Sequence, residues 1–138
     1  MYLDKEIDRL ITRLRASEKL TGVGIIKAYP YAPKPTCLNK CVIVLSPGSM
    51  NIKNEAIGDN VFFGKYSIDA VMFAPQDMGS PVALTLASDF LAAAVDNGVS
   101  SIYIGDTEKD DTVRCYSRKC TLTFYSDFVF GDDDDGTV

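Results

Sequence analysis

The end of the chain alternates between apolar and polar side chains, and this alternation constrains the fold more than any other feature. Between Cys120 and Phe130, residues of one parity are apolar with the exception of Ser126: Cys120, Leu122, Phe124, Phe128 and Phe130. The opposite parity carries Thr121, Thr123, Tyr125 and Asp127. A period of two over this length is typical of a long strand with one buried face. The pattern therefore predicts an antiparallel sheet that is covered on one face.

A second long strand is predicted over residues 61–74. Apolar side chains again share one parity: Phe62, Tyr66, Ile68, Ala70, Met72 and Ala74. Gly64 lacks a side chain, so we expect an irregularity such as a bulge there. Residues 41–45 are continuously apolar, which predicts a strand covered on both faces. The residue types of 46–49, Ser-Pro-Gly-Ser, favour a turn at its end.

Two helices are predicted, one at the start of the chain and one between the long strands. Residues 2–18 place apolar side chains at helical spacing, with charges on the other side: Leu3, Ile7, Leu10, Ile11 and Leu14. This amphipathic helix could dock on its own sheet or on a neighbouring subunit. A second helix is expected from Ser80 or Pro81 to about Asn97, with Ser80 as its N-cap and Gly98 in a left-handed turn. Its broad apolar face is expected to cover the sheet: Val82, Leu86, Phe90, Leu91, Ala94 and Val95.

Length and composition bound the domain organisation. The chain has 138 residues, of which 46% are hydrophobic and 24% charged. This is ordinary for one globular domain. We therefore expect a single α+β domain over residues 1–131, with a mainly antiparallel sheet, an N-terminal amphipathic helix and a second helix packed across the sheet. Residues 132–138 begin with four aspartates and are expected to form a disordered acidic tail.

The sequence carries little signal for catalysis. It contains no histidine, which removes the commonest general base and the commonest metal ligand. The spacings of Cys37, Cys41, Cys115 and Cys120 do not match common zinc sites. Acidic pairs between residues 105 and 111 share one polar turn, where solvated side chains are the simpler explanation. We therefore expect neither an enzyme nor a protein with a metal or other cofactor.

Five aromatic residues stand out as candidate contacts with a partner: Tyr29, Tyr31, Phe62, Phe63 and Tyr66. The two first tyrosines lie in a proline-rich segment that is expected to be a loop. Adjacent Phe62 and Phe63 must point to opposite faces of a strand. Each face of the sheet therefore carries one phenylalanine ring that requires cover. A second layer of the same domain or a partner subunit could supply that cover.

Charge is unevenly distributed along the chain. Of the 19 acidic residues four are Asp132 to Asp135, which leaves 15 against 14 Lys and Arg in residues 1–131. A basic surface for nucleic acid is therefore disfavoured. Residues 1–40 hold eight Lys or Arg against four acids, whereas residues 41–138 hold six against fifteen. Such polarity suits stacking of one copy against another, although ordinary surface scatter together with a solvated acidic tail is the simpler explanation.

The layout resembles that of the tail terminator proteins of long-tailed bacteriophages and prophages, and of the related neck or minor capsid proteins. The segments closest to that pattern are residues 67–75, leading into the helix at Ser80, and residues 118–125. The resemblance implies a structural virion protein that closes into a homohexameric ring on the tail tube. Its partners would be further copies of itself, the tail tube protein and the head-tail connector protein, and DNA would pass through the lumen without specific binding.

The resemblance carries no diagnostic motif, so it assigns no site residue. No apolar run is long enough for a signal peptide core or a membrane span. We expect the protein in the host cytoplasm before assembly and in the virion afterwards. The alternative from another class is a small cytoplasmic α+β protein, which binds a metal or a ligand through the cysteines or a helix N-terminus, or acts as an adaptor with no virion role.

Overall fold

The computed structural model describes residues 2–28, 39–54, 61–111 and 114–129. Along the chain the elements are α1 (Tyr2–Arg15), the 3-10 turn η1 (Glu18–Leu20), β1 (Gly24–Lys27), β2 (Val42–Asn54), β3 (Val61–Pro75), the 3-10 turn η2 (Gln76–Met78), α2 (Ser80–Val95), β4 (Ser101–Asp110) and β5 (Cys115–Val129). The tyrosine pair 29 and 31, Cys37 and the acidic tail 132–138 lie outside the described residues.

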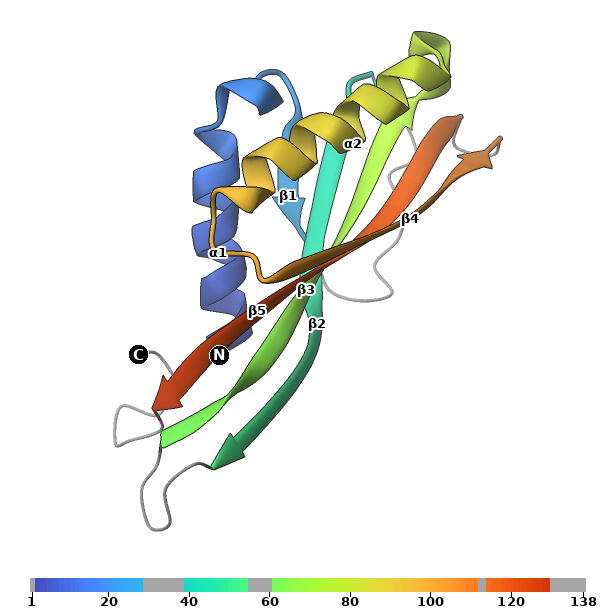
Figure 1. Cartoon of the computed structure of the whole chain (residues 1–138). Coiled ribbons are helices and arrows are strands. Elements are labelled where there is room, and N and C mark those ends of the chain that lie inside the picture. Colours follow the sequence, from blue (N-terminus) through green and yellow to red (C-terminus); the bar gives the residue numbers. More distant parts are fainter. Residues whose placement is uncertain (1, 29–38, 55–60, 112–113, 130–138) are drawn as a thin grey trace.

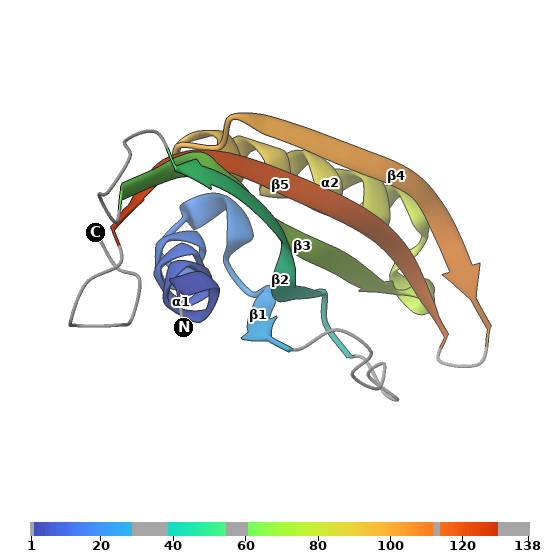
Figure 2. The same ribbon diagram turned by 90° about the horizontal axis from the view of Figure 1, so that it is seen from below.

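The strands form one sheet in the order β1-β2-β3-β5-β4. Only β1 runs parallel to its neighbour, and the other three pairs are antiparallel. Helix α2 crosses one end of the sheet, and α1 lies in the hollow of the curved sheet (Figures 1 and 2). The expected α+β architecture, a mainly antiparallel sheet with an N-terminal helix and a second helix across it, is confirmed.

Both helices pack on the same face of the sheet and share one apolar core. Even-numbered side chains of β3 and β5 point into it, including Ile68, Ala70, Cys120 and Leu122, each at most 2% exposed. The predicted parity of both long strands is thereby confirmed. Helix α1 docks on its own sheet, so the choice that the sequence left open is decided in favour of the same subunit.

The closing strand is longer than its alternation predicted. It starts at Cys115 and pairs with β3 without interruption from Cys115 opposite Pro75 to Val129 opposite Val61. No turn divides it, because each of its residues has a partner in the ladder of β3. Cys115 and Cys120 therefore point to opposite faces of one strand.

The turn predicted at residues 46–49 is wrong, because β2 continues through it to Asn54. Its register shifts between Pro47 and Met50, which is a bulge. The bulge accommodates a proline without a donor, and the Ser49 N–H donates a hydrogen bond to Ser67 Oγ at 2.8 Å. The irregularity expected at Gly64 is wrong, because Gly64 pairs in register with Ile52 of β2 and with Ser126 of β5.

The strand at residues 41–45 is covered less completely than its apolar run predicted. Ile43 and Leu45 are fully buried in the core, whereas Val42 and Val44 on the opposite face are only half-buried. A central position between β1 and β3 explains the run of β-branched residues without a second complete layer.

Helix α2 begins on Gly79 rather than on a serine cap. Gly79 occupies the N-cap position with φ of 86°, and no side chain caps the helix. Glycine is suited to this left-handed conformation. At the other end Asn97 donates a side-chain hydrogen bond to the Ala93 carbonyl at 2.7 Å, and Gly98 has φ of 77°. The predicted left-handed stop is confirmed, and the predicted Ser80 cap is wrong.

Candidate functional site

The described aromatic candidates fall on different sides of the sheet. Phe62 is half-buried and packs against the core, whereas Phe63 on the opposite face is 43% exposed. This is the alternation that two adjacent strand residues must adopt. The same subunit covers Phe62, and Phe63 is left accessible.

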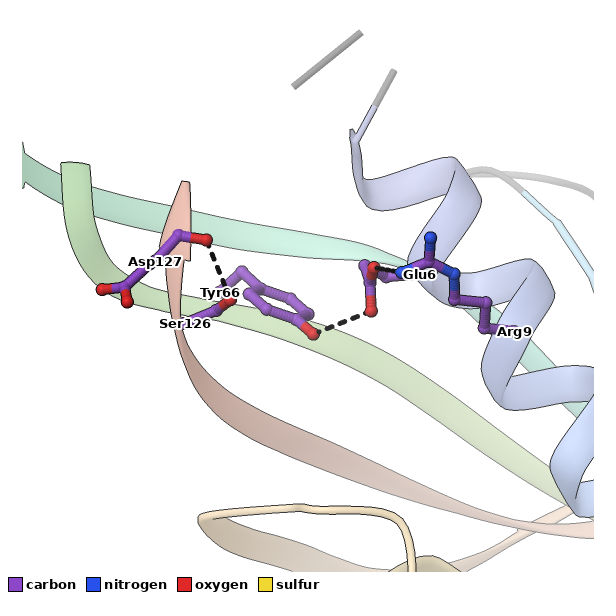
Figure 3. Close-up of polar contacts among 5 residues, drawn as sticks. All are labelled: Glu6, Arg9, Tyr66, Ser126 and Asp127. Carbon is purple, nitrogen blue, oxygen red and sulfur yellow. Dashed lines mark hydrogen bonds and ion pairs between the residues drawn. The ribbon is translucent and has the colours of Figure 1, made fainter. Parts of the chain in front are cut away.

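Tyr66 lies inside the subunit. Its ring is 5% exposed and stacks on Phe124 with the ring centroids 5.1 Å apart. Its hydroxyl donates to Glu6 Oε2 at 3.2 Å, and Glu6 Oε1 also accepts from Arg9 at 2.6 Å (Figure 3). This polar group joins α1 to the middle of β3, so Tyr66 ties the helix to the sheet.

Replacing Tyr66 by phenylalanine is expected to lower the free energy of unfolding by about 1 kcal/mol, because it removes a part-buried hydrogen bond to a carboxylate. The ring stacking on Phe124 stays. Urea unfolding measures the change, and Tyr103→Phe is the matched control, since Tyr103 is 71% exposed. Equal stability of the two variants would contradict the structural role of the Tyr66 hydroxyl.

A small cavity adjoins this polar group. Its volume is about 50 Å³, and Glu6, Arg9, Arg13, Tyr66 and Asn97 supply its polar lining. That volume suits a few ordered water molecules. Binding sites for organic ligands are usually several hundred Å³ in volume. This cavity therefore does not have the size of a cofactor site.

The cysteines do not form a metal centre within the parts of the chain that the structure describes. No group of three or more Cys, Asp or Glu side chains is close enough there to hold an ion. Burial, together with the charge of Asp69, raises the pKa of Cys120 to about 12. Burial also raises the pKa of Cys41. Both thiols are therefore protonated at neutral pH, a form that is a poor metal ligand and a poor nucleophile.

Accessible apolar side chains occur on two surfaces of the subunit. On the sheet face away from the helices, Phe63, Tyr103 and Tyr125 are 43%, 71% and 56% exposed. On the helix layer, Leu84 and Val95 of α2 are 60% and 58% exposed. The expectation that Val95 faces the core is wrong. Val95 follows the fully buried Phe90 by five residues, which places it about 140° further around the helix and away from the sheet.

The α2 surface could have been recognised in the sequence. The helix has apolar residues on all sides and only one charged residue, Asp89, between Ser80 and Val95. A helix that is apolar all round is normally buried on all sides. The exposure of Tyr125 agrees with the alternation of the closing strand, which predicted that this side chain points away from the core.

Comparisons with known proteins add little to this geometry. No protein-family model matches the chain, and no curated protein is significantly similar to it. One solved structure, whose printed name states no function, is 17% identical, covers 93% of this chain and 98% of its own, and has a TM-score of 0.45. None of the helices within the described ranges is long and apolar enough to cross a membrane.

Proposed function

We propose that this protein is a structural subunit of a bacteriophage or prophage tail, a tail terminator that forms a ring on the tail tube and joins it to the head connector. One observation carries the proposal: the subunit exposes apolar side chains on two opposite sides, at Phe63 and Tyr125 on the sheet and at Leu84 and Val95 on α2. A head-to-tail contact between copies requires two different interaction surfaces on opposite sides of the subunit.

The layout of the chain supports the same proposal. An N-terminal helix, long antiparallel strands and a helix across the sheet make up the arrangement on which the resemblance to tail terminators rests. The protein has no catalytic role in this proposal. Its product is the assembled ring, with further copies, the tail tube protein and the connector as its partners.

Electron microscopy of the purified protein tests the proposal, both alone and after mixing with tubes of the tail tube protein from the same virus. We expect closed rings of uniform diameter, alone or at one end of each tube. Deleting the gene from the virus or prophage is expected to give tubes of irregular length without attached heads. Complete, infectious particles from the deletion strain would overturn the proposal and favour an adaptor with no virion role.

A further inference from the structure

One side of α1 carries a row of basic residues. Lys5, Arg9 and Arg13 follow one another at intervals of four, so they lie along one side of the helix. Arg9 and Arg13 are exposed, and Lys5 is half-buried. We call these three residues the basic row. Arg13 forms no ion pair with any residue that the structure describes, so its charge is available to a partner.

The basic row lies on the side of α1 that faces β5. Arg9 and Arg13 line the small cavity beside α1 together with Phe124 of β5. The other side of the helix faces β1, where Asp8 forms an ion pair with Lys27 at 2.9 Å. The basic row is therefore next to the strand that leads into residues 130–138.

Two acidic residues lie near the basic row and offset part of its charge. Glu6 accepts a hydrogen bond from Arg9 at 2.6 Å. Asp96 is adjacent to Asn97, which lines the same cavity, and it forms no ion pair with Arg13. Three positive charges against two negative ones leave this side of the helix positive. A short run of carboxylates is the partner that suits it, because the guanidinium group of arginine binds a carboxylate through paired N–H groups.

The segment that follows β5 has the required chemistry and length. Residues 132–135 are four consecutive aspartates. β5 ends at Val129, on the side of the molecule where α1 begins (Figures 1 and 2). Phe124 lies five residues before this end, which is about 17 Å of strand. Residues 132–135 lie three to six residues beyond it, which is up to about 20 Å of extended chain. A segment that turns back along β5 therefore reaches the basic row.

We propose that residues 132–135 lie along the basic row of their own copy, with their carboxylates beside Lys5, Arg9 and Arg13. The occupant is this segment because it has the opposite charge and lies within reach. Its attachment to β5 also gives it a high effective concentration at the row. A row that is occupied in this way is not available to the phosphate groups of nucleic acid. The inference does not depend on the proposed virion role.

A second pair of basic side chains lies near the end of β5, on the opposite face of the sheet. Lys53 and Lys65 are exposed there. Asp127 is exposed on the same face, beside Phe63 in the ladder, and its charge opposes the approach of further carboxylates. Lysine also lacks the paired N–H groups with which arginine binds a carboxylate. We therefore place the acidic segment on α1 and use the two lysines as the comparison in the test.

Zero-length cross-linking of the full chain tests the contact. A water-soluble carbodiimide joins a lysine amine to a carboxylate only where the two groups touch, so Lys5 reports on residues 132–135. Unlabelled and isotope-labelled protein are mixed in equal amounts before the reaction. Mass spectrometry of the protease fragments then identifies each linked pair. A link within one copy carries a single isotope composition, whereas a link between copies can carry both.

We expect Lys5 to be linked to residues 132–135 within one copy, in larger yield than Lys53 or Lys65. Arg13→Glu places a negative charge in the basic row and is expected to lower the yield at Lys5 about fivefold, the upper range for an exposed ion pair. Lys65→Glu makes the same change of charge at an exposed position on the other face. It is the matched control, and its yield at Lys5 should equal that of the wild type. Circular dichroism confirms that both variants are folded.

Four results would overturn the inference. They are the absence of any link between Lys5 and residues 132–135, links that join two copies, a yield for Arg13→Glu equal to that of the wild type, and links formed mainly with Lys53 or Lys65. The last result would place the acidic segment on the opposite face of the sheet. The virion experiment is unaffected, because rings on tubes neither require nor exclude this contact.

Discussion

Replacing Phe90 by alanine is expected to lower the free energy of unfolding by about 4 kcal/mol, the largest effect of any single change considered for this protein. Phe90 is fully buried in the core that α2 shares with β3 and β5. Removal of its ring deletes apolar contacts and leaves a cavity that the surrounding sheet cannot fill. For a domain with ordinary stability this is a large share of the total.

Urea unfolding at low protein concentration, where the chain is monomeric, measures the effect of Phe90→Ala. Leu84→Ala is the matched control, since it lies in the same helix but is 60% exposed. Its expected cost in the monomer is below about 0.5 kcal/mol. A loss below about 1 kcal/mol for Phe90→Ala would show that α2 is not anchored on the sheet through this ring.

Replacing Gly64 by alanine is expected to lower the free energy of unfolding by about 2 to 3 kcal/mol. A Cβ atom at this position would collide with the carbonyl oxygen of Asn51 and lie 2.6 Å from the Cα atom of Ile52. Both atoms belong to the backbone of β2, so no side-chain rotation relieves the overlap. The strand would have to move away from β3 along the part of the ladder that pairs Ile52 with Gly64.

Gly105→Ala is the matched control for the Gly64 experiment. Gly105 also lies in a strand, but a Cβ there would meet its nearest neighbour, the Lys119 carbonyl oxygen, at an ordinary 3.6 Å. Thermal unfolding of the two variants compares them directly, and only Gly64→Ala should shift the midpoint strongly. Equal midpoints would contradict the close approach of β2 to Gly64.

The two long strands and their buried parity could be predicted from local patterning. Period-two alternation placed Ile68 and Leu122 on the core face, and the structure buries both almost completely. The position of α1 and the left-handed Gly98 that follows the end of α2 result from equally local rules of helix spacing and backbone conformation. These features depend on a few neighbouring residues, so the sequence alone is sufficient to find them.

Features that depend on distant segments could not be predicted. Pro47 and Gly48 have the residue types of a turn, yet they form a bulge because β3 runs alongside and Ser67 Oγ accepts the next amide. Gly64 likewise has the residue type of a bulge, yet its missing side chain serves the close approach of the β2 backbone. In both cases a strand more than ten residues away decides the local conformation.

The candidate interaction site could likewise be predicted only in part from local sequence. Of the described aromatic candidates only Phe63 is accessible, since Phe62 contacts the core and Tyr66 is held by Glu6 of α1. No pattern near Tyr66 indicates that partner, because sixty residues separate the two side chains. Tyr125 and Leu84 complete the exposed surfaces, and their exposure depends on which helices cover which face.

The sequence by itself determined the class of fold, the faces of the long strands and the uneven charge, because each of these follows from residue type and short-range spacing. The tertiary structure alone decided that both helices share one face of the sheet, and that the other face is accessible around Phe63, Tyr103 and Tyr125 but buried at Phe73 and Cys115. The physical reason is that burial depends on what packs against a side chain. For the alternating strand at the end of the chain, that is α2 on one side and, in the proposed ring, a second copy on the other.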